Sequence, residues 1–156
     1  MNQINLVLPN QLFKNSPLFT NNFPFYLVEE YLFFKQYPFH KQKIAFHRAT
    51  MKRYANFIQE EMNLDVHYIE SIDSISDIRL LIGNLKEIGV KQINYIDPVD
   101  GWIQKRLNQS CSENKITTKQ FPSPLFINTQ EDLKSFFTND KKKYNQTTFY
   151  KNQRKK

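Results

Sequence analysis

The chain has 156 residues, of which 40% are hydrophobic and 24% are charged, values typical of one globular domain rather than a disordered or fibrous protein. Its 3 glycines form neither a P-loop nor a Gly-x-Gly-x-x-Gly motif, and its single cysteine excludes an internal disulfide or a zinc site built from several cysteines. We expect a cytoplasmic protein, because cysteine is rare and no apolar run approaches the length that spans a membrane.

The excess positive charge, formally +7, lies at the end of the chain. Seven of the 22 basic residues fall within residues 141–156, which contain no acid, so residues 1–140 hold 15 basic and 15 acidic residues. Tyr144, Phe149 and Tyr150 interrupt the lysines, a pattern typical of packed aromatic side chains. Three interpretations stay open: a solvated tail, an arm that binds nucleic acid, and the first part of a further domain.

Short apolar runs alternate along the chain with segments of helical periodicity. In chain order they predict strands at 4–8 and 25–28, a helix at 41–63, a strand at 66–69, a helix at 74–87, a strand at 92–96, a helix at 100–111, a strand that begins at 116, and a helix at 130–137 capped by Thr129 with Asp132. This alternation indicates an α/β fold, a Rossmann-like open parallel sheet of about five strands with helices on both faces.

Ligands of such sheets bind outside the carboxyl ends of the strands, so the predicted loops at 9–24 and 29–40 and the segment 97–102 are where a site is expected. Glu29 and Glu30 end the second strand, where they either form an acid–base pair or cap a backbone group. The five aromatic residues of 31–39 either pack beneath the sheet or form a wall for a flat aromatic ligand.

Six segments, in order along almost the whole chain, resemble the amino-terminal domain of the photolyase-related proteins, the prokaryotic (6-4) photolyases or iron–sulfur bacterial cryptochromes and photolyases. The segment His40-Lys41-Gln42-Lys43-Ile44, preceded by two glutamates at a strand end, is the most specific of them. The others are Leu8-Pro9-Asn10-Gln11-Leu12, Val28-Glu29-Glu30, Ile96-Asp97-Pro98 with Trp102, Pro124-Leu125-Phe126-Ile127 and Phe149-Tyr150-Lys151-Asn152-Gln153-Arg154.

The resemblance implies two parts for the full-length protein. Residues 1–140 would form an α/β domain that holds an antenna chromophore, a lumazine in characterised members. Residues 141–156 would lead toward a helical domain, absent from this chain, that binds FAD and a [4Fe-4S] cluster and acts on DNA as a photolyase, a lyase. The chain would then be a light-harvesting domain of a DNA-repair enzyme or cryptochrome, without catalytic residues or a metal site of its own.

For the chromophore site, the resemblance points to seven residues at the strand ends and at the start of the long helix. Many members carry Gly-Asp where this chain has Pro9-Asn10, so an amide that both donates and accepts hydrogen bonds replaces a carboxylate. The predicted chromophore-binding residues are Asn10, Gln11, Leu12, Glu29, Glu30, His40 and Lys41.

A second function class is compatible with the same sequence. The chain would be a small α/β module that binds nucleic acid or a protein partner through its basic C-terminal segment. The two hypotheses differ in the affinity for nucleic acid, which the second expects to fall steeply with salt.

Overall fold

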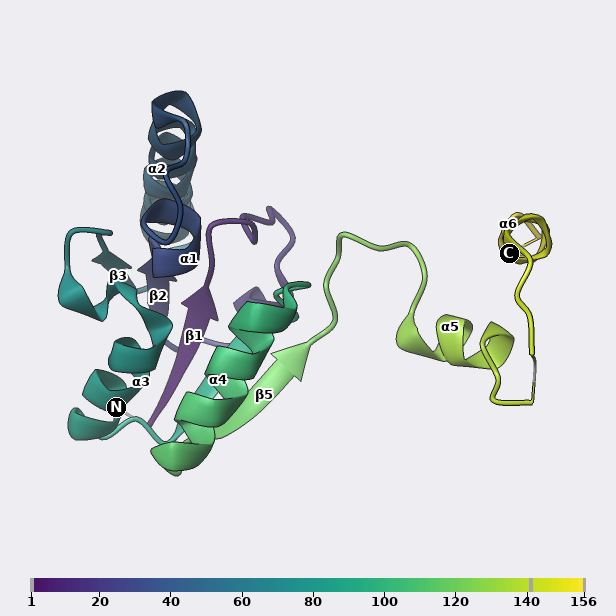
Figure 1. Cartoon of the computed structure of the whole chain (residues 1–156). Helices are drawn as coiled ribbons and strands as arrows, with labels where there is room; N and C mark the ends of the chain where they lie inside the picture. The colour runs from purple at the N-terminus through teal and green to yellow at the C-terminus, as the bar shows by residue number, and fades with distance from the viewer. Residues whose placement is uncertain (1, 141, 156) are drawn as a thin grey trace. The chain divides into compact units, whose positions relative to one another are not determined.

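The computed structural model describes residues 2–140 and 142–155, which form two compact units, Met1–Ser123 and Pro124–Lys156 (Figure 1). The first unit contains the sheet, and the second contains two short helices. The boundary between the two compact units differs from the start of the basic segment: the second unit begins after Ser123, whereas the basic segment begins at residue 141.

The first unit is built on a five-stranded sheet in which every pair of neighbouring strands is parallel. Its order is β3-β2-β1-β4-β5, so the direction of strand addition reverses between β1 and β4. The α/β, Rossmann-like fold predicted from the sequence is therefore confirmed. The strands are β1 (Gln3–Val7), β2 (Phe25–Val28), β3 (Val66–Ile69), β4 (Gln92–Ile96) and β5 (Thr117–Phe121).

Helices cover both faces of this sheet, and most of them follow the predicted ranges. The predicted helix at 41–63 is α2 (Lys41–Asn56) followed by a π-helical segment (Phe57–Glu61), and the one at 74–87 is a 3₁₀ turn (Ser74–Ser76) followed by α3 (Ile78–Glu87). The remaining elements of this unit are a 3₁₀ turn (Pro17–Thr20), α1 (Tyr31–Phe34) and α4 (Gly101–Glu113).

The prediction that residues 29–40 form a loop is wrong for its first part, where α1 is a single helical turn. The Glu30 side chain caps this turn by accepting a hydrogen bond from the Leu32 backbone N–H. Leu32 and Phe34 are buried, so these aromatic and apolar residues pack rather than lining an open loop. Four residues are too few to show helical periodicity, which is why the sequence pattern does not reveal the turn.

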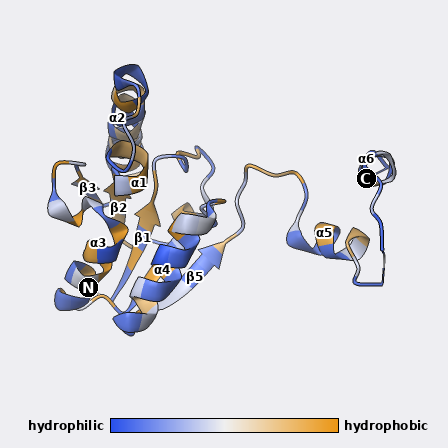
Figure 2. Ribbon diagram, viewed as in Figure 1, coloured by the Kyte–Doolittle hydropathy of each residue, from blue (hydrophilic) through white to orange (hydrophobic). Residues whose placement is uncertain are grey.

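Two separate hydrophobic cores lie on the two faces of the sheet. On one face, alternate β1 residues such as Ile4 and Leu6 pack with α3 and α4. On the other, Val7 and the β2 residues Phe25 and Leu27 pack with α2. The inner strands β1, β2 and β4 are accordingly buried along almost their whole length, whereas the edge strand β5 is largely exposed and polar (Figure 2).

The second unit consists of α5 (Gln130–Phe136) and α6 (Gln146–Gln153). The predicted capping box of α5 is present, since Thr129 and Asp132 bond each other's backbone N–H groups. Aromatic rings hold the two helices together: Phe136 lies 4.9 Å from Phe149 and Phe137 lies 4.9 Å from Tyr144 between ring centroids. Within residues 2–140 and 142–155, no helix is both long and apolar enough to cross a bilayer.

Candidate functional site

The carboxyl ends of β1 and β4, where the strand order reverses, are bridged by two amide side chains. Gln11 is buried and donates hydrogen bonds through Nε2 to the carbonyl oxygens of Ile96 (2.8 Å) and Asp97 (3.2 Å). Asn10 donates through Nδ2 to the carbonyl oxygen of Pro98 at 3.2 Å. These two predicted site residues therefore tie the loop after β1 to the loop after β4.

Glu29 is fully buried at the end of β2, and both of its carboxylate oxygens are hydrogen-bonded. Arg48 binds the carboxylate with two donors, one of them Nε at 2.8 Å, while the Tyr68 hydroxyl donates at 2.7 Å and the Ser71 N–H at 2.8 Å. Burial alone would raise the pKa of Glu29, but Arg48 and the other donors outweigh it and lower the pKa to about 2. Glu29 is thus a permanently charged anchor between two strands and α2.

Glu30 is also fully buried but has the opposite ionisation behaviour. Its Oε2 accepts the capping hydrogen bond from the Leu32 N–H at 2.6 Å, whereas Oε1 has no hydrogen-bond partner among the described residues. The nearest cation, Arg106, lies 3.8 Å from Oε1. Burial raises the pKa of Glu30 to about 7, against the opposing effect of the backbone hydrogen bonds and Arg106.

His40 and Lys41 lie at the start of α2 with exposed side chains. His40 is the N-cap of α2, and its Nδ1 accepts a hydrogen bond from the Gln42 N–H at 3.2 Å. Of the seven predicted residues, His40 and Glu30 therefore cap helices, Glu29 anchors α2, and Asn10 and Gln11 tie two loops.

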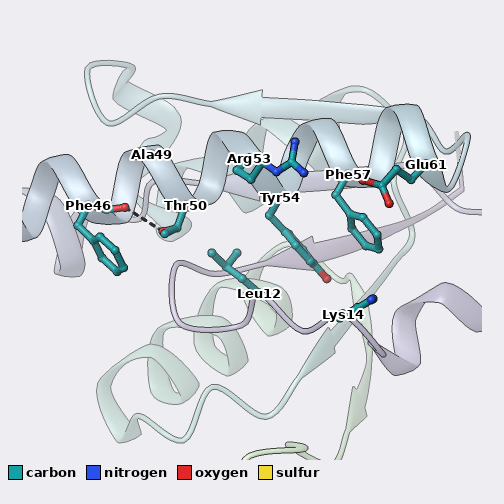
Figure 3. A pocket seen from close by; sticks show the side chains of 9 residues that line it. All are labelled: Leu12, Lys14, Phe46, Ala49, Thr50, Arg53, Tyr54, Phe57 and Glu61. Carbon is teal, nitrogen blue, oxygen red and sulfur yellow. Dashed lines mark hydrogen bonds between the residues drawn. The ribbon is translucent and has the colours of Figure 1, made fainter.

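A groove beside α2 is the most suitable place for a ligand that the described residues form. It has a volume of about 720 Å³ and runs between α2 and the loop after β1 (Figure 3). Leu12 is the one predicted site residue that lines it. The complete lining is Leu12 and Lys14 from the loop, and Phe46, Ala49, Thr50, Arg53, Tyr54, Phe57 and Glu61 from α2 and the π-helical segment.

One side of the groove is made of fixed aromatic rings. Tyr54 is buried, and its hydroxyl donates a hydrogen bond to the carbonyl oxygen of Phe13 at 2.7 Å, which joins α2 to the loop. Its ring stacks on Phe57 with centroids 5.8 Å apart, and Phe19 supports both. Phe46 at the other end is 69% exposed. The groove thus combines a rigid aromatic base with an exposed aromatic side chain.

The sequence left two options open for residues 31–39, core packing or an aromatic wall, and did not reveal the groove beside α2. The available signal was a second stripe on the helix predicted at 41–63, where Phe46, Ala49, Arg53 and Phe57 recur every three or four residues beside the buried stripe. Apolar side chains that gather on an exposed face mark ligand or interaction sites, whereas a single exposed one needs no explanation. On the opposite wall, Leu12 is predicted through the family resemblance, whereas Lys14 is brought there by the fold.

Fold and site together define an α/β protein with an open parallel sheet, strand-end loops joined by hydrogen bonds, and an aromatic groove beside one helix. The comparison with protein families gives the particular class: residues 5–156 match the deoxyribodipyrimidine photo-lyase-related protein family, and the chain belongs to that family. It is also 30% identical over 166 residues to the uncharacterized protein R852 of Acanthamoeba polyphaga mimivirus, an alignment that covers 100% of this chain and 83% of that protein.

Replacing Gln11 with alanine should destabilise the protein. The change leaves the buried carbonyl oxygen of Ile96 without its donor, and such a loss costs ~1–3 kcal/mol in free energy of unfolding. Urea denaturation measures the effect. Gln109→Ala is the matched control, because Gln109 is exposed and bonds only Glu113, so its cost should stay within ~0.5 kcal/mol. Equal losses of unfolding free energy for the two variants would contradict the structural role of the hydrogen bond from Gln11 to Ile96.

Glu30→Gln should stabilise the protein increasingly as pH rises from about 4.5 to about 7. The amide oxygen of the introduced side chain can still cap α1, but it carries no charge to bury. In the wild type the unfolded chain ionises Glu30 near pH 4.5 and the folded chain only near pH 7, so folding stability falls across this window and is constant above it. The variant's advantage at pH 8 should approach ~3 kcal/mol, at ~1.4 kcal/mol per pKa unit.

Unfolding midpoints of both proteins between pH 4 and pH 8 provide the test. Glu29→Gln should behave in the opposite way: it breaks the charged pair with Arg48, so its loss of stability should grow as pH rises from about 2 to about 4.5 and stay constant above that. If the stability difference between Glu30→Gln and the wild type does not change with pH, Glu30 ionises at the same pH in the folded and unfolded protein and its pKa is not raised by folding.

Proposed function

We propose that this chain is the light-harvesting domain of a photolyase-related protein and that it holds a flat heterocyclic antenna chromophore of the lumazine type. The observation that carries the proposal is the aromatic groove between α2 and the loop after β1, in a chain that belongs to this family. Leu12 belongs both to the groove and to the residues that the family resemblance indicates.

The groove has the physical properties that such a chromophore needs. Its volume lies within the range of small-molecule sites, and rings of Tyr54 and Phe57 provide faces for a planar heterocycle. The Tyr54 hydrogen bond fixes one wall relative to the other. An antenna supplies absorption of near-ultraviolet or blue light, and the work of the protein is to orient the ring and exclude water from it.

The other cofactors of the proposed full-length protein belong to a domain outside these residues. A [4Fe-4S] cluster takes four cysteines, and this chain has one, Cys111, which lies on α4 and is buried in the core. We assign FAD, the cluster and DNA contact to a helical domain, so that this chain harvests light and does not itself catalyse repair.

Ala49→Trp should abolish chromophore binding. Ala49 is exposed and lines the groove, so a tryptophan there fills the site while changing the stability by no more than ~0.5 kcal/mol. Titration of the purified chain with a ribityllumazine, followed by absorption and fluorescence, should give saturable binding at unit stoichiometry for the wild type and no binding for Ala49→Trp.

Ala45→Trp is the matched control for this experiment. Ala45 is also exposed on α2 but does not line the groove, and helical side chains lean toward the N-terminus, away from Ala49. This variant should bind like the wild type. Binding that survives Ala49→Trp would exclude the groove, and absence of binding to the wild type would reject the proposal for the chain by itself.

One observation favours the alternative function, nucleic-acid binding by the second unit. A hollow of about 430 Å³ on α6 is lined by Thr148, Lys151, Asn152, Arg154 and Lys155, three of which are basic. If this surface binds duplex DNA, each phosphate contact should add ~0.9 to the slope of log affinity against log salt. Lys151→Ala with Lys155→Ala should lower the slope by about 1.8, and Lys86→Ala with Lys91→Ala should leave it unchanged. Anisotropy titrations with no salt-dependent binding would exclude the alternative.

A further inference from the structure

Two cations border the groove, one on each wall, and neither has an acidic partner within residues 2–140 and 142–155. Lys14 lies on the loop after β1, and Arg53 lies on α2; both are exposed (Figure 3). Three other cations of the same fold are paired, Arg48 with Glu29, Lys52 with Glu70, and Arg79 with Asp77, whereas exposed lysines such as Lys86 have no acidic partner among the described residues. The groove therefore presents positive charge that the protein does not use internally.

The charge balance of the groove favours an anionic ligand. Lys14 and Arg53 contribute two positive charges and Glu61 one negative charge, while every other lining residue is uncharged. Arg53 carries a guanidinium that suits bidentate contact with phosphate, and Lys14 adds a second donor from the opposite wall. A ligand that is neutral throughout would leave both cations with water as their only partner.

The aromatic base and the charged rim lie in one groove and act on different parts of a ligand. Rings of Tyr54 and Phe57 offer stacking to a heterocycle, and Lys14 and Arg53 offer charge-assisted hydrogen bonds to a group at the end of a flexible chain. Resting on the function proposed above, we propose that the natural occupant carries a phosphate ester on the chain attached to its ring, and that Lys14 and Arg53 select for it.

Riboflavin and FMN test this proposal, because they share an isoalloxazine ring, which contains the pteridine ring of lumazine, and differ only by the terminal phosphate. The full chain is titrated with each, and binding is followed by the quenching of flavin fluorescence. We expect FMN to bind roughly tenfold more tightly than riboflavin, as charge-assisted hydrogen bonds to one phosphate would give. Raising the salt concentration should weaken FMN binding and leave riboflavin binding unchanged.

Single charge changes should shift the preference in predictable directions. Lys14→Ala and Arg53→Ala should each lower FMN affinity several-fold without affecting riboflavin, and Glu61→Gln should raise FMN affinity. Lys52→Ala is the matched control, because Lys52 precedes Arg53 on α2, pairs with Glu70 at 2.7 Å and does not line the groove. It should leave both affinities unchanged.

The outcomes separate this inference from the function on which it rests. Equal affinity for the two flavins, both lost in Ala49→Trp, would overturn the selection for phosphate and keep the groove as a heterocycle site. FMN binding that survives Ala49→Trp would overturn the inference by placing the phosphate contact elsewhere. Failure to bind either flavin or a ribityllumazine would reject the chromophore site and the phosphate selection together.

Discussion

The position of α2 depends on one buried carboxylate. Glu29 ends β2 and receives hydrogen bonds from Tyr68 on β3, from Ser71 just after that strand and from Arg48 on α2. Three elements that are distant in sequence thus share one anion, and the low pKa of Glu29 keeps that anion charged over the physiological range. Because the groove lies on the same helix as Arg48, the Glu29–Arg48 pair contributes to the position of the groove wall.

Adjacent glutamates illustrate how position decides ionisation. Glu29 and Glu30 are both without exposed surface, yet one has its pKa lowered to about 2 and the other has its pKa raised to about 7. The difference is the donors: a guanidinium, a hydroxyl and a backbone N–H surround Glu29, whereas Oε1 of Glu30 has only Arg106 at a distance beyond hydrogen bonding. The residue type alone, glutamate in both cases, predicts the same ionisation for the two side chains.

The sequence was informative where local pattern determines structure. Continuous apolar runs located the strands, because inner parallel strands are buried on both faces, and the Thr129–Asp132 spacing located the start of α5. The candidate site was less predictable. The hydrogen bond from Gln11 to the Ile96 carbonyl forms only because β1 lies beside β4 in the sheet. The groove forms only because Leu12 lies opposite α2, whose lining residues are about forty positions away in the sequence. Neither contact can be predicted from the hydrophobic periodicity of the sequence.

The separation of the groove from the core has a consequence for how such proteins diversify. Phe46, Ala49 and Arg53 are exposed and belong to neither hydrophobic core, so they can be exchanged at little cost in folding free energy. Anchors such as Glu29 and Gln11 lie outside the groove lining and hold the scaffold in place. Mutation can therefore change the lining of the groove, and with it the ligands that the groove accepts, while the architecture stays the same.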